Sequence, residues 1–367
     1  MRNFLPFLTL TNYALSMRLT GVKTLIQSDL TKVLILLILT ALTAALLCPW
    51  LFNAGKMLSE VAESRTTASS GSWLVQSCAN ATIIDFFHLS LAVCTMVLVG
   101  PFIMWMRLGN TGGLPHRNPW SLKLPQPSIT HTSGQPLRRN HSSWLHLGTG
   151  VLLAGSLTVL MMWLLVFTDW FVLQKPVMWW SAIQNSILPA GLSSMFQEWI
   201  FRGILLGICL RAMRPSIAIF MTACFFAIVH LLSPALGAEL AEPEKWDAGF
   251  RMFALIGERF IQPTDFVFPF LTLFCIGIIL AYARFRTASL WLPIGLHFGW
   301  LFIHRTFDQI STIAGDHLSS VNFFINAEHT TGLLPLSLLV ATALLVHVFT
   351  QISEEKRPKK LTAPTVN

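Results

Sequence analysis

The segment Val33–Phe52 reads VLILLILTALTAALLCPWLF, which is 20 residues without a charged side chain. A bilayer core about 30 Å thick is crossed by about 20 helical residues, because each residue advances a helix by about 1.5 Å. Only α-helices and closed β-barrels satisfy their backbone hydrogen bonds inside lipid, and this segment lacks the alternation of a barrel strand. The segment therefore predicts a membrane-spanning helix.

Further apolar runs of similar composition follow it along the chain. They are Ile83–Met106, Leu147–Thr168, Pro189–Leu210, Ile217–Leu232, Phe266–Ala283, Ala288–Ile303 and Leu333–Thr350. Of the 367 residues, 53% are hydrophobic and only 11% are charged, whereas a soluble domain carries about 25% charged residues. We therefore predict an all-α, polytopic membrane helix bundle with about eight transmembrane helices.

The basic residues indicate an orientation. If the N-terminus is cytoplasmic, 17 of the 25 Lys and Arg residues fall in cytoplasmic segments, which are 1–32, 107–146, 211–216, 284–287 and 351–367. Cytoplasmic loops of membrane proteins carry such an excess, so we expect both termini in the cytoplasm. The acidic segment 233–265 is then expected to be a loop on the opposite side. The expected location is the plasma (inner) membrane, with multiple passes.

Composition also divides the chain. We expect a two-helix membrane segment at 1–106, a cytoplasmic loop at 107–143, a six-helix membrane core at 144–350 and a basic cytoplasmic tail at 351–367. The loop 107–143 is basic and rich in proline, and such a segment cannot bury a core. The six cysteines show no CxxC spacing, so they do not indicate a disulfide framework or a zinc site.

Charged residues stand inside the run Pro189–Leu210. A charged side chain at the centre of a spanning helix costs about 2.5–3.5 kcal/mol on insertion scales, so it indicates a functional site. Glu198 and Arg202 are four residues apart and share a helix face, where they can form an ion pair. Pairing explains how both are tolerated in the membrane, but it does not explain why they are there.

Two later runs each contain a histidine in apolar surroundings. His230 ends the stretch FFAIVH, and His297 ends the stretch LPIGLH. A lone intramembrane histidine is more often a packed, hydrogen-bonded residue than a catalyst, but two histidines and Glu198 on three separate spans indicate a shared cavity. Glutamate and histidine together can activate a water as a general base. They could also hold zinc, which often takes two histidines and a glutamate.

Three motifs now stand in order along the chain. They are Gln197-Glu198-xxx-Arg202, Phe226-xxx-His230 and Thr287-Ala288-Ser289-Leu290-Trp291-xx-Ile294-xx-His297. Across about residues 180–305, they resemble the CPBP family, which contains the type II CAAX prenyl endopeptidases and Abi-like bacteriocin-processing and immunity proteins. The resemblance implies an intramembrane endopeptidase of metallo- or glutamic type. It also implies that His230 and the motif's glutamates activate the attacking water, His297 stabilises the oxyanion and Arg202 holds the glutamates.

The sequence departs from the family pattern at two positions. Gln197 stands where the family has its first glutamate, and a neutral amide cannot accept a proton from water. Leu301 stands where the family has a final Asn or Asp, and Trp300 and His304 are the neighbouring polar side chains that could replace it.

These departures leave two further hypotheses. One is a catalytically inactive CPBP-fold scaffold or immunity protein. The other is a proton-coupled transporter that uses Glu198, Arg202, His230 and His297, although no inverted repeat supports it. For the protease we expect a membrane-anchored or lipidated peptide or protein substrate, contact with the lipid bilayer and no nucleic-acid partner. No cofactor is certain, and zinc is the one that these residues could bind.

Overall fold

The computed structural model describes residues 29–64, 75, 78–106, 143–234, 239–261, 263–314, 324–326 and 330–355. Most of the expected loop 107–143 and tail 351–367 therefore lie outside the described residues. The chain forms two compact units, one of residues 1–110 and 233–261 and the other of residues 111–232 and 262–367. Each unit is described by itself.

The first unit contains three described long helices, α2 (Asp29–Ser64), α4 (Ile83–Trp105) and α9 (Ala248–Ile261). Helix α4 begins at a capping box, in which Thr82 and Asp85 satisfy each other's backbone N–H groups. Helix α9 lies within the segment 233–265 that was expected to be a loop. It packs on α2 through Gly249, whose backbone lies directly against Ala45.

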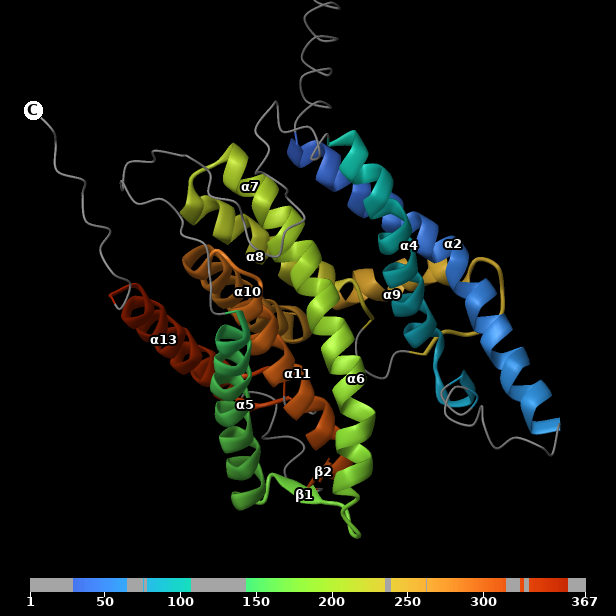
Figure 1. Cartoon of the computed structure of the whole chain (residues 1–367). Coiled ribbons are helices and arrows are strands. Elements are labelled where there is room, and N and C mark those ends of the chain that lie inside the picture. Colours follow the sequence, from blue (N-terminus) through green and yellow to red (C-terminus); the bar gives the residue numbers. More distant parts are fainter. Residues whose placement is uncertain are drawn as a thin grey trace, which may run out of the picture. The chain divides into compact units, whose positions relative to one another are not determined.

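The second unit holds the remaining helices. They are α5 (Ser143–Phe167), α6 (Trp179–Glu198), the π-helix η1 (Trp199–Leu205), α7 (Leu206–Ala212), α8 (Pro215–Leu231), α10 (Pro263–Thr287), α11 (Trp291–Ile310) and α13 (Leu333–Glu355). Helix α11 lies between α5 and α6 and packs against both, as Figure 1 shows.

The described structure is mostly helical, as the all-α prediction expects, and one short antiparallel pair of strands is added to the helices. Strand β1 (Phe171–Leu173) follows α5, strand β2 (Ser311–Ile313) follows α11, and Val172 lies opposite Thr312. Three residues are too few to show the alternation by which a strand is recognised in sequence. The pair joins the ends of two helices that already pack together.

Five of the described helices are long and apolar enough to cross a membrane. They are Thr31–Ala62, Ile83–Trp105, Ser143–Phe167, Phe266–Thr287 and Leu333–Ile352, and α8 is a shorter apolar helix. They correspond to six of the expected runs and indicate a membrane protein. The other two runs, 189–210 and 288–303, are helical but also carry the polar residues of the motifs. The count of eight spans and the orientation of the termini stay predictions.

The contact between α5 and α11 is made by glycines. A Cβ atom on Gly150 would lie 2.7 Å from the carbonyl oxygen of Leu292, and one on Gly299 would lie 3.0 Å from that of Val151. Gly295 lies equally close to the backbone of α5. Because any side chain at these positions would push the helices apart, the glycines set the closest approach of α11 to α5.

Candidate active site

Helix α6 presents small residues to its neighbours at every fourth position. This small-residue stripe is buried along its whole length and consists of Ala182, Ser186, Ala190 and Ser194, with Glu198 next in the series. At one end Gln309 of α11 donates from Nε2 to Ser186 Oγ at 2.9 Å. At the other end Glu198 contacts His297 of α11. The two contacts are equally far apart along both helices, so α6 and α11 run antiparallel in register.

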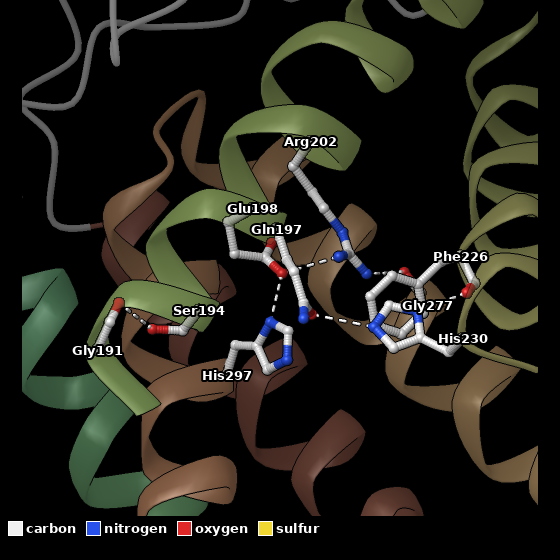
Figure 2. Close-up of polar contacts among 9 residues, drawn as sticks. All are labelled: Gly191, Ser194, Gln197, Glu198, Arg202, Phe226, His230, Gly277 and His297. Atoms are coloured by element: carbon white, nitrogen blue, oxygen red, sulfur yellow. Dashed lines mark hydrogen bonds and ion pairs between the residues drawn. The ribbon is translucent and has the colours of Figure 1, made fainter. Parts of the chain in front are cut away.

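Glu198, Arg202 and His297 form a buried ionic cluster (Figure 2). Arg202 Nη1 donates to Glu198 Oε1 at 2.8 Å, and His297 Nδ1 lies 2.7 Å from the same oxygen. The exposed fractions of Glu198, Arg202 and His297 are 0%, 1% and 5%. When an ion pair is buried away from water, only short hydrogen bonds of good geometry offset the cost of desolvating the two charges. The contacts of Glu198 with Arg202 and His297 are short enough to do so.

Arg202 is fixed by two further groups. Its Nη2 donates to the carbonyl oxygen of Gly277 on α10 at 3.4 Å, and its guanidinium carbon lies 4.3 Å from the centre of the Phe226 ring. A cation over an aromatic face is attracted by the ring's negative charge. Nothing in the sequence singled out Gly277, and Phe226 was visible only as the first residue of its motif.

The cluster keeps two polar atoms without a hydrogen-bond partner in the part of the chain that the structure describes. They are Glu198 Oε2 and Arg202 Nε, and both are buried. A buried carboxylate oxygen without a partner is costly, so it indicates a position that a water or substrate group occupies. Glu198 therefore has one oxygen bound to Arg202 and His297 and a second oxygen that accepts no hydrogen bond from the described residues.

The contact with Glu198 determines the tautomer of His297. A carboxylate can only accept, so His297 Nδ1 carries the proton and donates it to Glu198 Oε1. In the neutral ring, Nε2 is then the atom with a free lone pair. Glu198 thus holds His297 in a tautomer that can act as a base through Nε2.

His230 has a different partner. Its Nδ1 lies 2.7 Å from the carbonyl oxygen of Phe226 and therefore carries a proton, while its Nε2 lies 3.0 Å from the side-chain amide oxygen of Gln197. Two arrangements satisfy the second contact. Either His230 is an imidazolium that donates to the amide oxygen, or the neutral ring accepts from the amide N–H₂ group of Gln197 after a half-turn of that amide.

The structure therefore divides the expected site residues into two pairs. Glu198 pairs with His297, whereas His230 pairs with Gln197, and the rings of both histidines lie near Phe226, with centroid distances of 4.1 Å for His230 and 6.0 Å for His297. Both pairs come from the segments that the motifs marked.

The side chains considered as replacements at the final motif position have separate surroundings. Trp300 is buried in an apolar cluster with Leu280, Leu292 and Leu296, and its Nε1 has no hydrogen-bond partner among the described residues. Leu301 and His304 are half-buried. Trp300 thus packs among aliphatic side chains of the core.

The arrangement does not suit zinc. Among the described residues, no group of three His, Cys, Asp or Glu side chains is placed to hold a metal ion. The Nε2 atom of His230 contacts the amide of Gln197, and Glu198 Oε1 is already shared between Arg202 and His297. The chemistry of the site is accordingly derived from its side chains and water.

Comparison with known proteins agrees with the motifs. Residues 175–303 match the family described as Type II CAAX prenyl endopeptidase Rce1-like. No curated protein and no solved structure matches the chain. The matched segment begins just before α6 and ends within α11, so it contains all the residues of both pairs. From residue 175 to residue 303 the chain is therefore similar to the type II CAAX prenyl endopeptidases of the CPBP family.

Proposed function

We propose that the protein is an intramembrane endopeptidase that hydrolyses a peptide bond in a membrane-anchored or lipidated substrate at the plasma membrane. The observation that carries the proposal is the buried Glu198 carboxylate, which binds Arg202 through one oxygen and orients His297 through the same oxygen. An ion pair that only stabilises the fold needs no histidine as a third member. A histidine that acts as a base does need a carboxylate beside it, because the carboxylate fixes its tautomer and stabilises its protonated form.

In this proposal His297 is the general base. Its Nε2 removes a proton from a water molecule, and the water oxygen forms a bond with the carbonyl carbon of the substrate. Glu198 stabilises the imidazolium that results. The imidazolium then gives its proton to the leaving nitrogen as the C–N bond breaks, which restores the neutral ring.

Gln197 supplies the oxyanion donor in the same scheme. When its amide N–H₂ group donates one hydrogen to His230 Nε2, the second hydrogen remains for the developing oxyanion. Side-chain amides act in this way in other acyl-transfer sites. The roles that the resemblance implies are then exchanged, because the base function moves from position 197 to His297 and the oxyanion-donor function moves from His297 to Gln197.

The test is cleavage of a library of lipidated and membrane-anchored peptides by the purified protein in detergent. We expect His297→Ala and Glu198→Gln to lower the rate of cleavage by about 100-fold or more, as removal of a general base does. We expect Gln197→Glu to lower the rate by about 100-fold as well, because a carboxylate cannot donate to an oxyanion. Gln351→Glu makes the same change at an exposed position of α13 and should leave the rate unchanged.

A second candidate function is a non-catalytic membrane scaffold or immunity protein. The observation that favours it is the contact between the Gln197 amide and His230, in which no carboxylate is available to the histidine of the second motif. This candidate predicts the opposite response of one variant. The wild type would not cleave any peptide, and Gln197→Glu would gain cleavage.

A further inference from the structure

The ion pair between Glu198 and Arg202 is joined by a single short hydrogen bond. Arg202 Nη1 donates to Glu198 Oε1 at 2.8 Å, whereas Arg202 Nε and Glu198 Oε2 are buried and have no hydrogen-bond partner among the described residues. A guanidinium and a carboxylate often form two parallel hydrogen bonds, and Nε and Oε2 are the atoms that a second bond would join. The pair therefore leaves unsatisfied two atoms that could satisfy each other, although an unpaired buried polar atom is costly.

Two contacts of Arg202 with other helices oppose the second bond. Nη2 donates to the carbonyl oxygen of Gly277 on α10 at 3.4 Å, and the guanidinium carbon lies over the ring of Phe226 on α8, 4.3 Å from its centre. To form two parallel bonds, the guanidinium must turn into the plane of the carboxylate, and such a turn disturbs both contacts. The contact with Gly277 is long for a hydrogen bond, whereas the contact with Phe226 is close for a cation over a ring. Phe226 is therefore the stronger support.

The ring of Phe226 is itself held in place. Phe226 is 1% exposed, and the ring of Phe201 meets it at a right angle, with 5.1 Å between the two centroids. One turn earlier on α8, a Cβ atom on Gly277 would lie 2.8 Å from the Cα atom of Ala223, so α8 and α10 are in direct backbone contact here. Figure 2 shows the guanidinium of Arg202 between the Glu198 carboxylate and the Phe226 ring.

We propose that Phe226 is a positioning residue, whose ring face holds Arg202 to one hydrogen bond with Glu198. The inference rests on the proposed function, in which Glu198 stabilises the imidazolium of His297. A second parallel bond from Arg202 would neutralise the carboxylate more fully, so that less of its negative charge would act on His297. The ring thereby keeps the carboxylate available to the base.

The geometry is tested without any substrate, by NMR of the protein with isotope-labelled arginine in nanodiscs. The proton on Arg202 Nε is identified by its loss in Arg202→Lys. In the wild type we expect the chemical shift of an unbonded group, and in Phe226→Leu a downfield shift, because Nε then donates to the carboxylate. Phe225→Leu is the matched control and should leave the signal unchanged, since Phe225 is the neighbouring buried residue of α8 and its side chain points about 100° away.

Cleavage kinetics then connect this geometry with the reaction. We expect Phe226→Leu to lower kcat about tenfold or more with little change in KM, because the ring acts through Arg202 and not on the substrate. A fluorinated phenylalanine at position 226 keeps the shape of the ring but weakens its negative face. It should change kcat and the Nε proton in the same direction, and at position 225 it should change neither.

An Nε proton that does not move in either variant of position 226 would overturn the proposal. An unchanged kcat in both variants of an active enzyme would also overturn it. A shifted proton in a protein that cleaves no peptide would instead overturn the proposed hydrolysis and leave the support of Arg202 by Phe226 standing.

Discussion

Two neighbouring residues of one helix, Gln197 and Glu198, each contact a histidine. The two contacts differ in the charge of the helix residue, in burial and in the groups that surround them. The Glu198–His297 pair is charged, sealed from solvent and supported by Arg202. The Gln197–His230 pair contains no carboxylate and is half-buried. Successive side chains of a helix point about 100° apart, so one position of difference directs the two residues to different helices. The direction of the side chains therefore determines that His297, and not His230, contacts the carboxylate of Glu198.

The largest effect on stability is expected when the charged pair loses its cation. Arg202→Met leaves the carboxylate of Glu198 buried without its guanidinium partner, which should lower the free energy of unfolding by about 3–5 kcal/mol. The free energy of unfolding is measured by denaturation in mixed micelles. The double variant Arg202→Met/Glu198→Gln removes the orphaned charge and should recover most of the loss.

Arg305→Met is the matched control, because Arg305 is an exposed residue of α11. It should change the free energy of unfolding by no more than about 0.5 kcal/mol. If Arg202→Met lost as little stability as this, the ionic cluster would not stabilise the fold more than the Gln197–His230 pair does.

A smaller effect is expected when α11 is moved away from α5. Gly295→Ala places a methyl group against the backbone of Leu147, which should cost about 1–3 kcal/mol because neither backbone can yield easily. It should also weaken the Glu198–His297 contact, since α11 carries His297. Gly207→Ala is the control, as no atom lies within 4 Å of its new Cβ, and it should leave stability unchanged or slightly higher. Equal responses of the two variants would mean that the glycine contact does not position α11.

The smallest effect is expected in the Gln197–His230 pair. His230→Phe keeps a ring of similar shape but removes the contacts with Phe226 and Gln197, and neutral hydrogen bonds contribute only about 0.5–1.5 kcal/mol each. The free energy of unfolding should therefore fall by much less than in Arg202→Met. If His230→Phe lowered the free energy of unfolding as much as Arg202→Met, the two pairs would contribute equally to stability.

Much of the site was predictable from local sequence. The spacing of Glu198 and Arg202 predicts their contact, because residues four apart meet on a helix face, and the unusual cost of charge in an apolar run marks the segment as functional. The partner of each histidine was not predictable. For His297 it depends on the register between α6 and α11, to which the small-residue stripe and the glycines contribute without a chemical signal of their own. For His230 it depends on how α8 packs beside α6.

The fold was predictable to the same degree. Long apolar runs predict helices because a bilayer admits little else. Helix α9 was missed because only one of its faces is apolar and it is short and partly charged, and strands β1 and β2 were missed because their pairing is a long-range event. Gly277 enters the site through its backbone alone, and no sequence pattern reports such a contact.

The glycine contact between α5 and α11 also determines the direction of approach to the base. His297 stands two residues from both Gly295 and Gly299, and residues two apart lie about 200° around a helix, so His297 faces away from α5. On the α5 side the two backbones touch and leave no passage even for a methyl group. In the proposed reaction, a scissile bond therefore reaches His297 from only one side of α11, the side that faces α6 and Phe226, because the opposite side of the helix is closed by α5.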